Sequence, residues 1–142
     1  MARTVLLFVL ISSILLVGCS QSSTVEGVVD HKMVEGVKGS TQCSLLLSRT
    51  GLDGTPENSV YDDGFQACFP VHGELVVSEG VENQMKAVYS DFVYHVMVRK
   101  SPGDNLDCYA SREIFNRMRL GATVKFQVSE SSGVPRIVRI IG

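Results

Sequence analysis

Two histidines in this chain each stand two residues before a methionine. His31 precedes Met33, and His95 precedes Met97. Side chains two positions apart in a β-strand point to the same face, so each pair could present an imidazole and a thioether together. These soft ligands suit Cu(I). A copper(I) site on two strands is therefore one hypothesis for the four residues, and outward-facing strand residues without a ligand are the alternative.

Four cysteines form a second group of reactive side chains, and three of them follow residue 19. An odd number allows one disulfide and one spare thiol, or no disulfide. If residues 41–47 and 65–71 are antiparallel arms of one hairpin, Cys43 lies near Cys68. A bridge between them would close a loop of about 25 residues and contribute about 3 kcal/mol. Cys108 is then predicted to be a buried, apolar thiol.

The fourth cysteine, Cys19, ends a segment that has the composition of an export signal. Arg3 supplies a positive charge, and residues 5–17 form an apolar run that is shorter than the 20 or so residues needed to span a bilayer. The sequence Leu16-Val17-Gly18-Cys19 resembles the lipobox of bacterial lipoproteins. The bulky Leu16 fits a lipobox, whereas ordinary secretory cleavage after Gly18 would favour a small residue there.

The lipobox resemblance implies a processed and lipidated chain. Residues 1–18 would be removed as a signal peptide, and Cys19 would carry acyl chains such as palmitate. Two or more chains anchor a protein stably, whereas one binds reversibly. Residues 19–23 are then the lipidated cysteine with a short polar tether, and residues 24–142 a single domain. The residue after Cys19 is Ser20. In lipoproteins of this kind an Asp at that position implies retention at the inner membrane, so Ser20 implies sorting to the outer membrane, with the domain facing the periplasm.

Alternating apolar residues predict that this domain is built mainly from strands. The strongest candidate covers residues 87–99, and a turn over residues 101–105 leads to a second arm at residues 106–109. Ser111 is a suitable N-cap for a short helix that ends before Gly121. Further predicted strands cover residues 25–34, 43–47, 65–69, 74–78, 124–128 and 134–141.

The order of long hairpin, short helix, glycine and two strands over residues 86–142 resembles a partly open barrel of the oligonucleotide/oligosaccharide-binding (OB) type. Small bacterial domains of unknown function share this order. The resemblance implies a mainly β fold, a small OB-like β-barrel with one short helix. It transfers no residue roles, because a fold alone does not determine a function.

The composition of the chain and the motifs that it lacks reduce the number of function classes to consider. The 13 Lys and Arg residues and 15 Asp and Glu residues give a net charge of −2, which does not favour nucleic acid as a partner. The sequence has no HExxH, GxSxG, Walker A or CxxC motif, so we expect no enzyme. We expect a non-catalytic binding or assembly module, anchored to the membrane through Cys19, with an envelope protein or glycan as partner. The alternative is a small periplasmic Cu(I) carrier, and Cu(I) is then the one expected cofactor.

Overall fold

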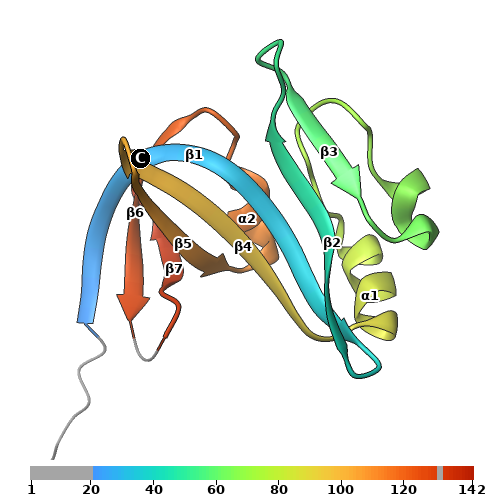
Figure 1. Ribbon diagram of the computed structural model, residues 1–142. Coiled ribbons are helices and arrows are strands. Elements are labelled where there is room, and N and C mark those ends of the chain that lie inside the picture. Colours follow the sequence, from blue (N-terminus) through green and yellow to red (C-terminus); the bar gives the residue numbers. More distant parts are fainter. Residues whose placement is uncertain (1–20, 131–132) are drawn as a thin grey trace, which may run out of the picture.

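The computed structural model describes residues 21–130 and 133–142 (Figure 1). Cys19 and the predicted signal peptide lie outside these residues. The elements, in chain order, are β1 (Gln21–Lys38), β2 (Thr41–Thr50), β3 (Pro56–Val60), the 3-10 helix η1 (Asp63–Cys68), α1 (Glu79–Val88), β4 (Ser90–Ser101), β5 (Asp104–Ala110), α2 (Arg112–Arg117), β6 (Thr123–Glu130) and β7 (Arg136–Ile140).

Five of the strands close into a barrel. Around the ring, β1 pairs with β4, β4 with β5, β5 with β7, β7 with β6, and β6 again with β1. The contact between β5 and β7 is parallel and the other four are antiparallel. This arrangement confirms the predicted small, OB-like β-barrel, with the ring closed rather than partly open.

Strand β1 is long and curved because it serves two parts of the sheet. Its first half, from Gln21 to Val28, pairs with β6, and its second half, from His31 to Lys38, pairs with β2. Near the bend, a Cβ atom on Gly27 would lie 2.6 Å from the backbone oxygen of Arg99 on β4. The close approach of the two strands therefore requires glycine at this position.

An irregularity in β1 changes which residues face the core. The register against β4 shifts between Val29 and His31. Val29 is buried before the shift and Lys32 after it, so Asp30 and His31 both remain on the outside. Such a bulge redirects side chains, and here it places two polar residues side by side on the outer face.

The segment between β1 and β4 extends the sheet beyond the barrel. Strand β2 pairs with β1, and β3 pairs with β2 at the edge (Figure 1). The strand predicted at residues 65–69 is wrong, because residues 63–68 form η1. Asp62 caps this helix by accepting a hydrogen bond from the backbone nitrogen of Gly64. Phe65 and Phe69 are both buried, so these apolar residues do face the core as the pattern predicts. They reach it from a helical turn and its C-cap, and not from a strand.

The strand predicted at residues 74–78 is also wrong. Leu75 and Val77 are buried in alternation, as a strand would require. However, the backbone nitrogen of Val77 donates to the Asn116 side chain, and Asn116 Nδ2 donates back to the Val77 oxygen, both at 2.8 Å. The side-chain amide of Asn116 thus makes the two backbone hydrogen bonds that a neighbouring strand would otherwise make with Val77.

Two helices complete the domain. Helix α1 was not predicted, and it moves the start of the strongest predicted strand from residue 87 to Ser90. Helix α2 follows Ser111, whose side chain accepts from the backbone nitrogen of Ile114, as predicted. Phe115 and Met118 are fully buried against the barrel.

Candidate functional site

The strand register brings the four predicted metal ligands together. His31 on β1 lies opposite Met97 on β4, and Met33 lies opposite His95. Residues directly opposite each other in an antiparallel pair share a face of the sheet. Because Lys32, between His31 and Met33, points into the core, these four residues lie on the outer face of the barrel wall. We call them the histidine–methionine cluster.

Both histidines of this cluster are held by a carboxylate at the same ring nitrogen. His31 Nδ1 lies 3.1 Å from Asp30, and His95 Nδ1 lies 3.2 Å from Asp107. His95 is only 7% exposed, and its buried Nε2 lies 3.0 Å from Glu35 without the geometry of a hydrogen bond. A carboxylate on Nδ1 is the usual outer partner of a metal-binding histidine. In His31 this leaves Nε2 for a ligand, whereas in His95 the Nε2 atom already faces Glu35.

The thioethers have less defined surroundings. The Ser44 hydroxyl lies 3.7 Å from the Met33 sulfur and 3.5 Å from the carboxylate of Glu35. Residues 21–130 and 133–142 contain no group of three or more His, Cys, Asp or Glu side chains that could hold a metal ion. A metal at this place would therefore depend on the two methionines.

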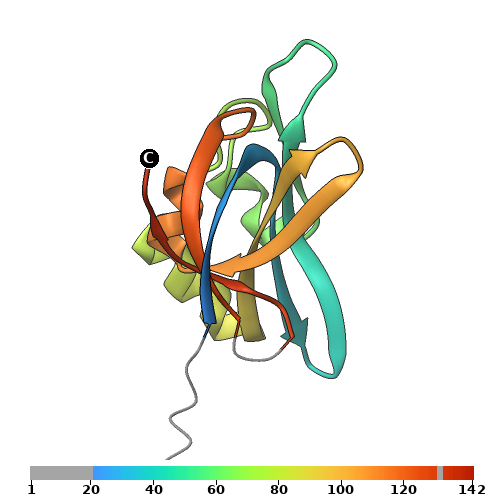
Figure 2. The same ribbon diagram turned by 90° about the vertical axis from the view of Figure 1, so that its left-hand side faces the viewer.

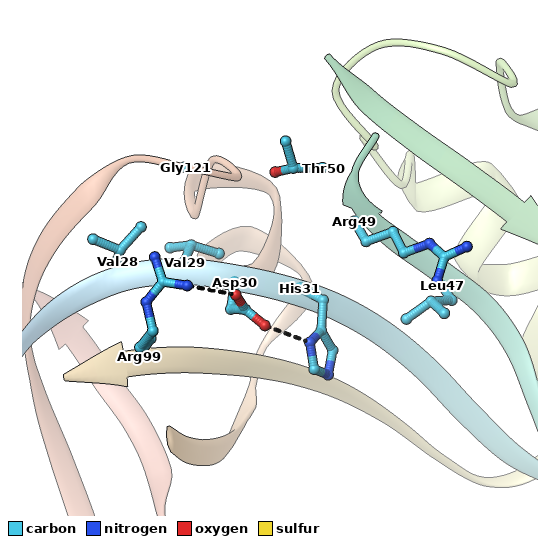
Figure 3. Close-up of a pocket in the computed structure, with 9 residues that line it drawn as sticks. All are labelled: Val28, Val29, Asp30, His31, Leu47, Arg49, Thr50, Arg99 and Gly121. Carbon is cyan, nitrogen blue, oxygen red and sulfur yellow. Dashed lines mark hydrogen bonds and ion pairs between the residues drawn. The ribbon is translucent and has the colours of Figure 1, made fainter. Parts of the chain in front are cut away.

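A cavity of about 710 Å³ has His31 of the cluster in its lining, and Figure 3 shows the residues that line it. Residues 28–31 of β1 line it, together with the end of β2, Arg99 of β4 and the turn at Gly121. We call it the β1 cavity. Its size falls within the range typical of small-molecule sites, roughly 300–1,000 Å³. His31 belongs both to the cavity and to the histidine–methionine cluster, so the two features adjoin.

Charged side chains line the β1 cavity. Asp30 lies between His31, at 3.1 Å, and Arg99, at 3.4 Å (Figure 3). Arg49 stands opposite His31 in the strand register, and its side chain extends along β2 beside Leu47. No ion pair to Arg49 is found in the part of the chain that the structure describes. The cavity thus holds two guanidinium groups and a single carboxylate.

Sequence reasoning missed Lys32, which is fully buried. Its Nζ donates to the backbone oxygen of Leu75 at 3.3 Å and lies 4.3 Å from the centre of the Phe115 ring. Burial lowers the pKa of Lys32 to about 8, against an opposing effect of Glu74. No local signal marked it, because strict alternation places Lys32 on one face with Asp30 and Val34, and only the irregularity in β1 turns Val29 inward in place of Asp30.

Cys43 and Cys68 do not lie in the predicted hairpin, whereas Cys108 is buried as predicted. Cys43, Cys68 and Cys108 are free thiols in the structure. The hairpin that would have brought Cys43 to Cys68 is not formed, because β2 pairs with residues 56–60 and Cys68 ends η1. Cys43 Sγ instead lies 3.6 Å from the backbone oxygen of Gly36. Cys108 is buried as predicted, and its burial raises the pKa of the thiol to about 12.

Comparisons with known proteins add no relative. Within the described ranges, no helix is long and apolar enough to cross a bilayer. No family model, curated protein or solved structure matches the chain.

Proposed function

We propose that this protein is a lipid-anchored lipoprotein of the bacterial envelope that works as a non-catalytic binding module. Its anchor is Cys19, its membrane the outer rather than the inner one, and its barrel faces the periplasm. The lipobox-like residues 16–19 support the anchor. The β1 cavity supports a binding role, because concave sites of this size are where proteins usually hold ligands.

One feature of β1 carries the proposal, because this strand joins the anchor to the cavity. It begins at Gln21, two positions after Cys19, and residues 21–23 of the predicted tether belong to it. The seven steps from Gln21 to Val28 span about 23 Å at roughly 3.3 Å per residue. In Figure 2, β1 starts at the lower end of the barrel and runs upward. An anchor at Cys19 would hold the barrel against the bilayer and the β1 cavity away from it.

Replacing Cys19 tests the anchor. In cells that express the full chain with Cys19→Ala, we expect an unprocessed precursor that takes up no labelled palmitate, because a lipobox is cleaved only next to an acylated cysteine. The matched control is Cys43→Ala, which leaves the lipobox intact and should be processed and labelled normally. Membrane retention of a correctly cleaved Cys19→Ala chain would contradict the proposal.

A Cu(I) carrier is the second candidate, and the register of β1 against β4 favours it. This register puts His31 beside Met97 and Met33 beside His95, and each imidazole has an aspartate at Nδ1. The four side chains of the cluster would hold the metal, with Nε2 of each histidine and the two sulfur atoms as ligands, and Glu35 would have to move from its place 3.0 Å from His95 Nε2. Imidazole and thioether favour Cu(I) over harder cations.

A copper titration separates the two candidates. The full chain, with its thiols blocked, is titrated with Cu(I) in competition with a coloured chelator. A carrier should bind one equivalent, and His95→Ala should lose that binding, whereas His72→Ala should not, because the exposed His72 lies outside the cluster. Equal uptake by His95→Ala and His72→Ala, or no uptake by the unmutated chain, would rule out the carrier.

A further inference from the structure

One nitrogen atom in the barrel wall is buried without a hydrogen-bond partner. His95 is only 7% exposed, and no hydrogen bond to its Nε2 atom is found within residues 21–130 and 133–142. An oxygen of Glu35 lies 3.0 Å from this atom, but away from the direction in which an Nε2–H group would donate. A buried nitrogen in such a place costs free energy unless a further group satisfies it.

The separation of these two atoms is that of two ligands on one metal ion. Imidazole nitrogen and carboxylate oxygen bind zinc and metals of similar size at about 2.0–2.2 Å, so two such ligands at neighbouring positions lie about 3 Å apart. The metal then lies on the lone-pair axis of the nitrogen, and the oxygen lies to one side of that axis. His95 and Glu35 have this arrangement, whereas a hydrogen-bonded ion pair would favour an oxygen in line with the N–H bond.

Met33 and Ser44 bring two more donor atoms to the same face of the sheet. Met33 on β1 lies opposite His95 on β4, and Ser44 on β2 lies opposite Glu35 on β1. The Ser44 hydroxyl lies 3.5 Å from Oε1 of Glu35 and 3.7 Å from the sulfur of Met33. Three strands thus direct an imidazole, a carboxylate and a thioether to one place, and a hydroxyl links the last two.

The surroundings of these side chains favour a cation. Glu35 and Asp107 approach the two ring nitrogens of His95, and neither carboxylate forms an ion pair with a lysine or arginine in the part of the chain that the structure describes. Even a protonated His95 would balance only one of the two carboxylates. Glu35 also lines a cavity of about 270 Å³ together with Asp91 and Tyr109, whose ring packs edge-on against His95. This cavity offers a cation a route to the carboxylate.

We propose that His95 Nε2 and the Glu35 carboxylate bind a divalent transition-metal ion, with Cu²⁺ as the best fit and Met33 as a weaker third ligand. Copper(II) is bound more tightly by nitrogen and oxygen ligands than the other divalent first-row metals, and it accepts a distant thioether as an axial ligand. Asp107 holds the imidazole through Nδ1, and Ser44 holds the carboxylate, so these two are positioning residues.

This site goes beyond the proposed binding module and rests on neither its anchor nor the β1 cavity. It shares Met33 and His95 with the Cu(I) candidate. It differs because Glu35 stays in place as a ligand, and His31 and Met97 take no part. The two sites therefore respond to different substitutions and to different oxidation states of copper.

A Cu²⁺ titration of the full chain tests the site, in a non-ionic detergent and with the thiols blocked. Glycine is present as a competitor that removes weakly held copper, and binding is followed by electron paramagnetic resonance. We expect one bound ion whose spectrum shows coupling to a single imidazole. No Cu²⁺ retained against glycine, or a spectrum with two or more imidazoles, would overturn the proposal.

Two substitutions separate this site from the Cu(I) candidate. Glu35→Gln keeps the size of the side chain and its contact with Ser44, but it removes a charged ligand and should weaken Cu²⁺ binding by about tenfold or more. His31→Ala is the matched control. It removes a ligand of the Cu(I) site and should leave Cu²⁺ binding unchanged. Equal affinity of Glu35→Gln and the unmutated chain, or an equal loss in both variants, would overturn the proposal.

A third substitution tests the positioning role of Asp107. Asp107→Asn leaves all three ligands in place, and it should weaken Cu²⁺ binding roughly 10- to 100-fold and alter the resonance spectrum. Asp104→Asn, at an exposed position of the same strand, is the matched control and should change neither. Thermal unfolding of the metal-free variants shows that the barrel is intact. An unchanged affinity and spectrum in Asp107→Asn would overturn this part of the proposal.

The tests of the anchor and of the metal site can fail separately. Membrane retention of Cys19→Ala would remove the anchor and leave the Cu²⁺ titration unaffected. A failed Cu²⁺ titration would remove the metal site and leave the processing of Cys19 and the binding role of the β1 cavity as proposed.

Discussion

At the scale of single residues, the buried Lys32 is the most unusual feature of the barrel. It occupies a core position, where its ammonium group contacts the backbone oxygen of Leu75 and the face of the Phe115 ring. An ammonium group in such a place loses most of its hydration, and the low pKa of about 8 reflects that cost. The amine therefore costs stability at neutral pH, where it is still charged.

This cost predicts a specific dependence of stability on pH. Because the pKa of Lys32 is lower in the folded chain than in the unfolded chain, the folded state releases the proton first. The contribution of Lys32 to the free energy of unfolding should rise between pH 8 and 10.5, by on the order of 3 kcal/mol. Lys32→Met should make the protein more stable at pH 7 and remove this rise.

The measurement is urea denaturation of the unmutated chain and of Lys32→Met between pH 7 and 10.5. Cys108 contributes in the opposite direction, since burial raises the pKa of its thiol. The difference between the two chains isolates Lys32, because both contain Cys108. Lys125→Met, at an exposed position of β6, is the control and should show a constant difference. A constant difference for Lys32→Met as well would contradict the prediction.

At the scale of elements, the bend of β1 depends on Gly27. A methyl group there would come within 2.6 Å of both the Arg99 oxygen and a Val98 methyl carbon. We expect Gly27→Ala to lower the free energy of unfolding by about 1–3 kcal/mol, since β1 and β4 must move apart. Gly80→Ala in α1, where no atom lies within 4 Å, should instead raise it by up to about 1 kcal/mol. Thermal unfolding of the two variants checks both signs, and equal effects would show that the close approach is unimportant.

Local sequence patterns predicted the strands and α2 better than the segment between β3 and β4. Ser111 is a local signal for the N-cap of α2. The alternation from Val124 to Val128 indicates a strand with one face in the core, which is β6. Residues 74–78 alternate in the same way, yet their partner is Asn116, which is 39 positions from Val77. Helix α1 had a local signal that was not used, since Ser78 accepts from Val81 and acidic residues occupy the first turn.

The candidate site was only partly predictable for the same reason. The spacing of His31 with Met33, and of His95 with Met97, showed which residues share a face. Whether the two strands are neighbours, and in which register, depends on pairing between distant segments. The β1 cavity is harder still, because the bulge at Asp30 and the approach of Arg49 arise only from that pairing.

At the scale of the whole molecule, the proposed anchor predicts how the barrel sits on its membrane. Glu130 on β6 lies opposite Gln21, the first residue of β1, and is therefore close to the anchored end. The turn between β2 and β3, with the fully exposed Leu52, lies at the other end of the molecule in both Figures 1 and 2. A bilayer held near Cys19 should therefore shield the first site and leave the second open.

Labelling with a bulky maleimide tests this orientation. In intact membranes, a thiol introduced by Glu130→Cys should react severalfold more slowly than after solubilisation in detergent, whereas one from Leu52→Cys should react equally fast in both. The parent chain corrects for its own thiols, of which Cys108 is buried. Inserting about 20 Gly and Ser residues between Ser20 and Gln21 lengthens the tether by roughly 25 Å, so it should restore fast labelling at residue 130. Slow labelling that persists with the long tether would mean that the protein itself, and not the nearby bilayer, covers this end of the barrel.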